Sequence, residues 1–306
     1  MAAPCAAFVR AVLLLLCLVP LVSSAEALRV LVVLSDAAAP YQAFAKTFRQ
    51  NLPVSIKTSL IERAEDFSGD EGGADLIVTV GVKASYWVTQ RTTTPVLAAL
   101  IPSSRYAELL AKHPRTSQLS AIYLDQPWAR QAGLLRAALP ERRNIGVLYS
   151  ADTKLDLRAL KEALSRQGFT LIAKLLKNND TLFADLEEVL ENSDVLLAIP
   201  DGTIYSSNHI RNILLSSYRR GIPLMGSSQA YVNAGALCAI FSTPEHLAAQ
   251  ASVATLVFAD THRLPEAKYP ELYSIAVNRE VGRTLNITIK STELLQFQVE
   301  KTQGNL

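Results

Sequence analysis

Short aliphatic runs alternate with segments of helical periodicity along this 306-residue chain, and the series of alternations occurs twice. Residues 28–34, 74–81 and 94–101 read as buried strands in the first series, and 144–149 and 194–199 do so in the second. Helical segments of about 10 to 15 residues separate such runs, which is typical of parallel sheets covered by helices on both faces. The pattern predicts an α/β protein with two Rossmann-like lobes.

The predicted lobes meet near residues 120–127, where the first series ends and the second begins. We therefore assign 26–122 to the first lobe and 123–242 to the second, and we expect about 243–306 to return to the first. No Pro- or Gly-rich stretch separates the two series. The lobes should therefore be joined by short crossing strands that act as a hinge, and not by a flexible tether.

The first 25 residues have the pattern of a secretory signal. Arg10 is followed by the apolar run 11–19 and then by small residues, with Ser23 and Ala25 placed for cleavage after Ala25. An N-terminal membrane anchor is the alternative, but the apolar run is short for a membrane span. The sequence predicts export to the periplasm. Cys238 is then the one remaining cysteine, which excludes an internal disulfide.

Several functions are disfavoured by what the sequence lacks. The formal net charge is +2, with no basic run, so the sequence offers no surface for nucleic acid. No nucleophile elbow, phosphate loop or metal-ligand spacing is present, and Gly226-Ser-Ser-Gln-Ala230 departs from the elbow at its last position. We therefore predict no catalytic residue, no metal site and no cofactor.

Polar residues gather just after the predicted strands, where ligands bind in open parallel sheets. Hydroxyl groups and helix N-termini at these positions suit a carboxylate or hydroxyl ligand, an aspartate suits an ammonium group, and tyrosines can stack on an apolar part. The candidate ligand-binding residues are Asp36, Tyr41, Gly81, Lys83, Ser103, Tyr149, Asp201 and Ser227.

Each candidate also has a purely structural interpretation. Asp36 and Asp201 can cap the helices that follow them, and Gly81 can serve turn geometry alone. Tyr149 can be a core residue at a strand end, and Lys83 a solvated side chain. The two tryptophans, Trp87 and Trp128, are expected to pack in the core or the hinge.

Residues from about 126 to 289 resemble the ABC transporter substrate-binding family that includes tryptophan-binding receptors. The segments that carry the resemblance are 134–149, 193–201, 221–227, 233–237 and 275–278, and 75–81 fits the first lobe. The resemblance implies a type I periplasmic binding fold whose lobes close on a ligand and deliver it to a membrane permease. It implies ligand contacts at Gly81, Tyr149, Asp201 and Ser227.

This sequence departs from the family in the first lobe. The usual Gly-rich stretch at the first crossing is replaced by Thr116-Ser-Gln-Leu-Ser-Ala-Ile-Tyr123, and the usual Asp-Pro after the fourth strand by Ile101-Pro-Ser-Ser104. We therefore expect a branch of the family with an altered ligand or one that no longer serves transport.

The leading hypothesis is an exported, monomeric solute-binding protein that captures an amino acid or a similar small organic molecule for an ABC permease. One alternative is an envelope sensor that uses the same fold to bind a partner protein. A second alternative is an exported hydrolase-like enzyme on a doubly wound scaffold.

Overall fold

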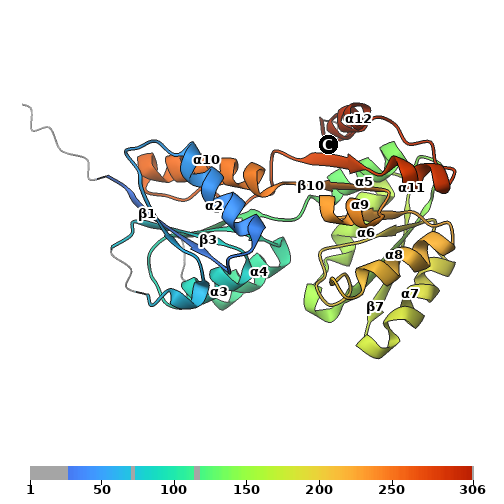
Figure 1. The fold of residues 1–306 in the computed structure, drawn as a ribbon, viewed down its shortest axis with the longest axis horizontal. Helices are drawn as coiled ribbons and strands as arrows, with labels where there is room; N and C mark the ends of the chain where they lie inside the picture. Colours follow the sequence, from blue (N-terminus) through green and yellow to red (C-terminus); the bar gives the residue numbers. More distant parts are fainter. Residues whose placement is uncertain (1–26, 70–72, 114–117, 305–306) are drawn as a thin grey trace, which may run out of the picture.

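The computed structural model describes residues 27–69, 73–113 and 118–304, which form two α/β lobes side by side (Figure 1). The predicted signal segment, 1–25, lies outside the described residues. Each lobe contains its own sheet, one of five strands and one of six. The predicted class, two Rossmann-like lobes joined by a hinge, is confirmed.

The first sheet is parallel throughout, with strand order β2-β1-β3-β4-β5. Every residue of β3 and β4 is buried, which explains why both strands are continuous aliphatic runs in the sequence. The strands are β1 (Arg29–Leu34), β2 (Lys57–Ile61), β3 (Leu76–Val80), β4 (Val96–Ile101) and β5 (Leu119–Tyr123).

Helices cover both faces of this sheet. Phe44 and Phe48 of α2 (Ala39–Asn51) and Leu247 of α10 (Pro244–Thr261) pack in one cluster with alternate residues of the strands. On the other face, α3 (Val82–Thr89) and α4 (Ser103–Lys112) contribute Val88 and Leu109 to a second cluster. A 3-10 turn, η1 (Ala64–Asp66), packs beside α3.

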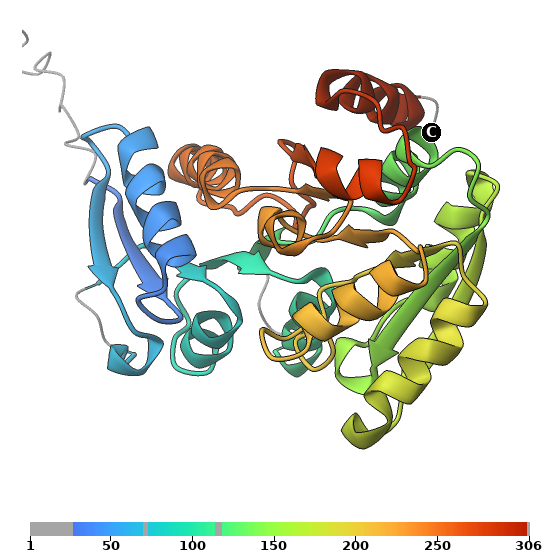
Figure 2. The ribbon, with the colours of Figure 1, turned by 45° about the vertical axis from the view of Figure 1, so that its right-hand side comes forward.

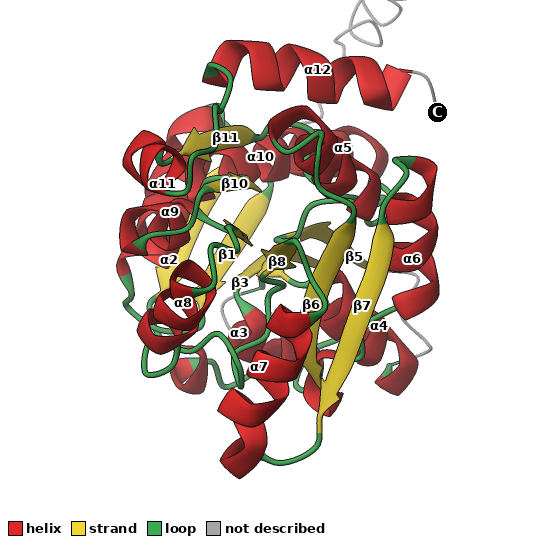
Figure 3. Ribbon diagram, turned by 90° about the vertical axis from the view of Figure 1, so that its right-hand side faces the viewer, coloured by secondary structure: helices red, strands yellow, loops and turns green. Residues whose placement is uncertain are grey.

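The second sheet has the order β11-β10-β9-β8-β6-β7, and its last strand, β11, runs antiparallel to β10. Its strands are β6 (Asn144–Ser150), β7 (Thr170–Leu176), β8 (Val195–Leu197), β9 (Leu224–Gly226), β10 (Cys238–Phe241) and β11 (Ser274–Val277). Helices surround this sheet, as seen in Figure 3. They are α5 (Trp128–Ala138), α6 (Leu157–Arg166), α7 (Leu182–Glu191), α8 (Ile210–Arg219), α9 (Gln229–Ala234), α11 (Arg279–Thr284) and α12 (Thr292–Gly304), with 3-10 turns η2 (Ala151–Thr153) and η3 (Asn179–Thr181).

The segment expected to complete the first lobe, 243–306, divides between the two lobes. Helix α10 packs on α2, and Lys268 forms a parallel bridge with Ile122 beside β5, so this part returns to the first lobe. The chain then crosses again, because β11 pairs with β10 and α12 packs on α5. The expectation is therefore corrected for 274–304, which belong to the second lobe. Edge pairing by a late strand depends on long-range contacts that periodicity does not encode.

The chain crosses between the lobes three times, and one hydrogen-bond chain ties the three crossings together. Gln126 Nε2, in the first crossing, donates to Ser242 Oγ at 2.9 Å in the second, and Ser242 Oγ donates to the carbonyl of Leu272 in the third. Arg130 Nη1 donates to Gln126 Oε1 at 2.6 Å and to the carbonyl of Pro270 at 2.8 Å. These bonds tie the crossing segments into one region, whose backbone between the two lobes is seen in Figure 2.

Within the part of the chain that the structure describes, no helix combines the length and apolar character needed to cross a membrane.

We predict that Gly146→Ala destabilises the second lobe by about 1–3 kcal/mol, because a Cβ in β6 would overpack the core. That atom would lie 2.4 Å from Ser193 Oγ and 2.7 Å from Val189 Cγ1. Urea unfolding of the purified protein measures the effect. Gly202→Ala is the matched control, since nothing lies within 4 Å of its Cβ position. Equal free energies of unfolding for both variants would contradict this account of the packing.

Candidate functional site

A cavity of about 300 Å³ lies between the lobes, beside the crossing segments. The first lobe contributes the start of α4, the second lobe contributes the loop from η2 to α6 and the end of β8, and the crossings contribute the remaining wall. The side chains discussed below are Ser103, Asp125, Trp128, Thr153, Lys154, Asp156, Pro200 and Tyr269.

The first-lobe wall is built around a Ser103–Asp125 contact. Ser103 begins α4, a helix that the sequence pattern did not predict, and Asp125 follows β5. Ser103 donates its backbone N–H to Asp125 Oδ1 at 2.7 Å and its hydroxyl to Oδ2 at 2.6 Å. Burial raises the pKa of the Asp125 carboxyl, and the two bonds from Ser103 oppose that shift. Asp125 thus presents a partly desolvated carboxyl group to the cavity.

Aromatic side chains from the crossings line the floor of the cavity. Trp128 is the first residue of α5, directly after Pro127, and its half-buried indole reaches the cavity. Tyr269 packs edge-on against Tyr123 with ring centroids 5.0 Å apart, and its hydroxyl shares a hydrogen bond with Ser103. Such rings offer an apolar surface with a polar edge to a small ligand.

The second-lobe wall is held in place by Asp201. Its carboxylate accepts from the N–H groups of Ser150 at 2.7 Å, Thr203 at 3.0 Å and Ile204 at 3.1 Å, and from the hydroxyl of Thr153. Burial acts to raise the pKa of Asp201, but these bonds outweigh it and hold the pKa below its usual value. Asp201 therefore positions Thr153 and Pro200, which line the cavity. Both of its carboxylate oxygens already accept hydrogen bonds from the protein.

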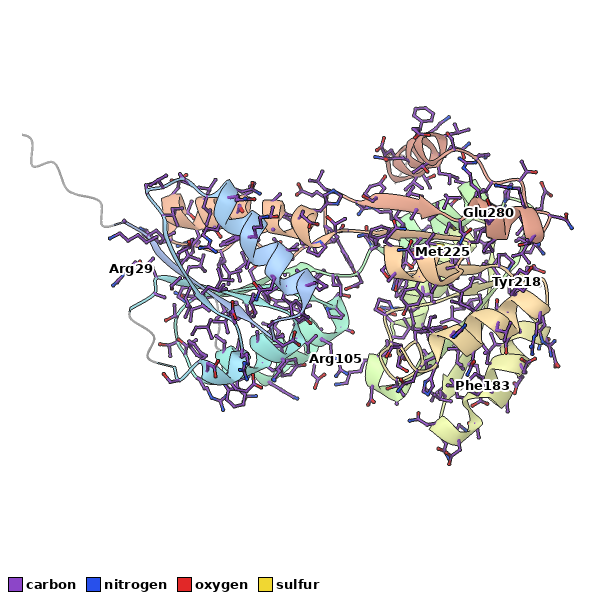
Figure 4. The ribbon with its side chains drawn as sticks, in the orientation of Figure 1. Arg29, Arg105, Phe183, Tyr218, Met225 and Glu280 are labelled. Atoms are coloured by element: carbon purple, nitrogen blue, oxygen red, sulfur yellow. The ribbon has the colours of Figure 1, made fainter. Side chains whose placement is uncertain are left out.

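An ion pair joins the lobes across the mouth of the cavity. Lys154, which has a left-handed backbone with φ +48°, places its Nζ 3.6 Å from Glu108 Oε2 on α4. Glu108 also pairs with Lys112 and Arg105 of its own helix, and Figure 4 shows Arg105 on the side of the first lobe that faces the second. The pKa of the Glu108 carboxyl is lowered to about 2, and the hydrogen bond from Lys112 is the largest cause of this shift.

Three of the predicted residues lie at the same edge of the first sheet but do not line the cavity. Gly81 has φ +93°, and a Cβ there would lie 2.5 Å from Ser35 Oγ and 3.0 Å from the ring of Tyr41. Glycine is thus required for close packing at this edge. Asp36 is exposed, and its Oδ1 accepts from the N–H of Ala38 at 2.8 Å just before α2.

Three further predicted residues, Lys83, Tyr149 and Ser227, also lie outside the cavity lining. Lys83 forms an exposed ion pair with Glu65. Tyr149 is half-buried and packs against the core of the second lobe. Ser227 follows β9 and hydrogen-bonds Tyr231. Of the eight predicted residues, the structure places Ser103 in the cavity wall and Asp201 directly behind it.

Sequence reasoning missed Asp125 and Tyr269. Asp125 directly follows the short, mainly apolar run 120–124, at the predicted meeting point of the lobes, so its position was an available signal. Tyr269 lies on the third crossing, and only the folded chain brings it to Ser103. The described residues contain no cluster of three or more side chains suited to a metal ion. Cys238 is buried, and burial raises the pKa of its thiol to about 12, so it is a core residue.

We predict that Asp201→Asn lowers the free energy of unfolding by about 2 kcal/mol at neutral pH, because hydrogen bonds to a charged acceptor are lost. The folded-state pKa is lowered, so the wild-type advantage is full above the unfolded-state value of about 3.9 and is lost as pH falls from there through the folded pKa. Urea unfolding from pH 7 to pH 3 measures the difference. Asp36→Asn, at an exposed turn, should change stability by less than about 0.5 kcal/mol. A difference independent of pH would contradict the assignment.

We predict that Lys154→Gln shifts the free protein toward more open lobe arrangements by at most about five-fold in population, since exposed ion pairs are weak. Lys112→Gln is the control. It removes a cation that pairs with the same Glu108 carboxylate, but Lys112 and Glu108 both lie on α4, so their pair does not link the lobes. Distances between fluorophores on the two lobes report the shift. The effect should persist from pH 5 to pH 8, because Glu108 stays ionised, and shrink in high salt. Equal distances in both variants would rule out a role for the pair.

A family model described as ABC transporter substrate binding protein matches residues 57–292. No curated protein sequence matches the chain significantly. Among solved structures, the chain is similar to an ABC domain from Streptococcus pneumonia in complex with L-Trp, with 17% identity, a TM-score of 0.66, and coverage of 88% of this chain and 97% of that one.

A substrate-binding protein with adhesive properties from Clostridium difficile, in its ligand-free open form, has 18% identity and a TM-score of 0.70 over 87% of this chain and 97% of its own. A periplasmic solute-binding protein from Actinobacillus succinogenes with bound D-allose has 13% identity and a TM-score of 0.52, with coverage of 84% of this chain and 99% of its own. These identities establish the fold alone. Because the family model spans more than half of the sequence, the chain belongs to the ABC transporter substrate-binding protein family.

Proposed function

We propose that this protein is exported through residues 1–25, acts as a monomer, captures a small organic ligand between its lobes and delivers it to an ABC permease. The observation that carries the proposal is the cavity at the hinge, whose wall comes from both lobes and from the crossing segments. A ligand held there contacts both lobes at once. Family membership supports a binding role, and the proposal includes no catalytic step.

The chemistry of the wall favours a ligand with an apolar part and at least one charged or hydroxyl group. Trp128 and Tyr269 provide the apolar surface. The carboxyl of Asp125 suits an ammonium group, while the hydroxyl of Thr153 and the ammonium of Lys154 suit a carboxylate or a hydroxyl. An amino acid or a similar small molecule has this combination. The cavity volume lies at the lower end of the range of small-molecule sites.

Ligand capture would act through the lobe arrangement. A ligand that touches Ser103 on one side and Thr153 on the other gains contacts only when the lobes approach, so it favours the closed state by its differential affinity. In this proposal the lobes rotate about the crossings, and the hydrogen bonds between the crossings keep the cavity floor intact.

We predict that a ligand from a panel of amino acids, sugars and purines changes the fluorescence of Trp128. The chain has two tryptophans, so the Trp87→Phe variant has Trp128 as its single emitter. Trp87 is a sound control, because its Nε1 donates to the carbonyl of Phe67 at 3.1 Å within the first lobe. The titration signal should survive in Trp87→Phe and vanish in Trp128→Phe.

Calorimetric titration of the same ligand should show a loss of affinity of about 10-fold or more for Asp125→Asn, since a charge-assisted contact is removed. The exposed Asp36→Asn variant should keep its affinity. A panel that changes neither fluorescence nor melting temperature, or a Kd unaltered by Asp125→Asn, would overturn the proposed site.

A further inference from the structure

A cationic groove of about 690 Å³ lies on the second lobe, away from the inter-lobe cavity. It runs between α5 and α12, and Figure 3 shows α12 lying across the outer side of this lobe above α5. We call it the α5–α12 groove. The lining residues that matter here are Arg136, Arg166, Lys290, Gln298, Lys301 and Thr302.

The positive charge of this groove is poorly compensated. Among the described residues, four cationic side chains and no carboxylate line it. Arg166 pairs with Glu162, but Arg136 donates to the neutral carbonyls of Gln167 at 2.9 Å and Pro140 at 2.7 Å. Burial, and next the nearby Arg143, lower the pKa of Arg136, while the charge of Glu141 opposes that shift.

Among the described residues, neither lysine of the groove forms an ion pair with an acid. Lys290 Nζ donates to the amide oxygen of Gln298 at 2.9 Å, and Lys301 is exposed on α12. With the whole chain close to neutral at +2, this local field is not a consequence of overall charge. The groove therefore suits an anion that can contact several cations at once.

Apolar side chains border the same groove. Leu295 and Val299 anchor α12 in the core of the lobe and are fully buried. Leu294 lies one helical turn before Gln298, and Phe297 lies one turn before Lys301, so both adjoin the groove-lining stripe of the helix. They are nevertheless 44% and 63% exposed. A soluble anion gives no reason for this exposed pair, whereas the interface of an anionic bilayer accommodates both the phosphate groups and the apolar side chains.

We propose that the α5–α12 groove and the adjoining Leu294–Phe297 pair form a docking site for an anionic phospholipid surface. Lipid phosphates would contact the cations of the groove, and Phe297 would enter the boundary between headgroups and acyl chains. The groove shares no lining residue with the inter-lobe cavity, so the proposed docking does not rest on the ligand that the cavity binds.

The test is co-sedimentation of the protein with vesicles of phosphatidylcholine, alone or mixed with phosphatidylglycerol. Variants share the same N-terminus as the wild type, so any contribution from that segment cancels. We expect binding to the mixed vesicles only. Lys290→Gln/Lys301→Gln should weaken it about 25-fold, because each cation near an anionic surface contributes about five-fold. Phe297→Ser should weaken it with no change in charge.

The matched control is Lys46→Gln/Lys177→Gln, which removes two exposed lysines elsewhere and should bind like the wild type. Equal binding to both kinds of vesicle, or an equal loss in the control, would overturn the proposal. The proposal would also be overturned if the protein bound soluble polyglutamate as tightly as the vesicles and Phe297→Ser left that binding unchanged. That result would assign the groove to an acidic protein. Tryptophan titration of the cavity in the same variants should be unchanged, which separates this test from that of ligand capture.

Discussion

The hydrogen-bond chain through the three crossings is the contact on which the rest of the molecule depends. Gln126, Ser242 and the carbonyl of Leu272 come from segments far apart in the sequence, and they fix where one lobe ends and the other begins. Arg130 closes this network through Gln126 and Pro270 and stacks on Tyr273 at 4.4 Å. Because buried polar groups are costly when unpaired, these bonds specify one arrangement of the crossings. The cavity lies beside that arrangement, and its floor consists of residues that the crossings carry.

The cavity wall shows two different uses of carboxyl groups. Asp201 accepts four hydrogen bonds, two from Thr203 and Ile204 of its own loop and two from Ser150 and Thr153 at and just after the end of β6, which hold its pKa low and leave it a positioning residue. Asp125 is held by Ser103 alone among the hydrogen bonds described above, and burial raises its pKa. A group in that state responds more strongly to a charged partner, since a ligand cation would offset its desolvation. The structure thus separates the acid that shapes the site from the acid that faces it.

Two distinct surfaces of the second lobe have chemistry beyond what the fold requires. One faces the first lobe and combines hydroxyl, carboxyl and aromatic groups around a small cavity. The other faces outward and combines four cations, of which Arg166 pairs with Glu162, with exposed apolar side chains on α12. The two surfaces share no lining residue.

The sequence by itself determined the alternation of strands and helices and the class of fold, though not helix α4, because apolar periodicity is a local property that follows directly from burial on one or both sides of a sheet. It also identified strand ends as the place for polar chemistry, and Ser103 lies in the cavity wall on that basis. The tertiary structure alone decided that Tyr41 and Gly81 pack together at the sheet edge, that Asp125 and Tyr269 meet Ser103, and that residues 274–304 join the second lobe. Each of these depends on pairings between residues distant in sequence, whose geometry is set by the crossings and has no signature in local composition.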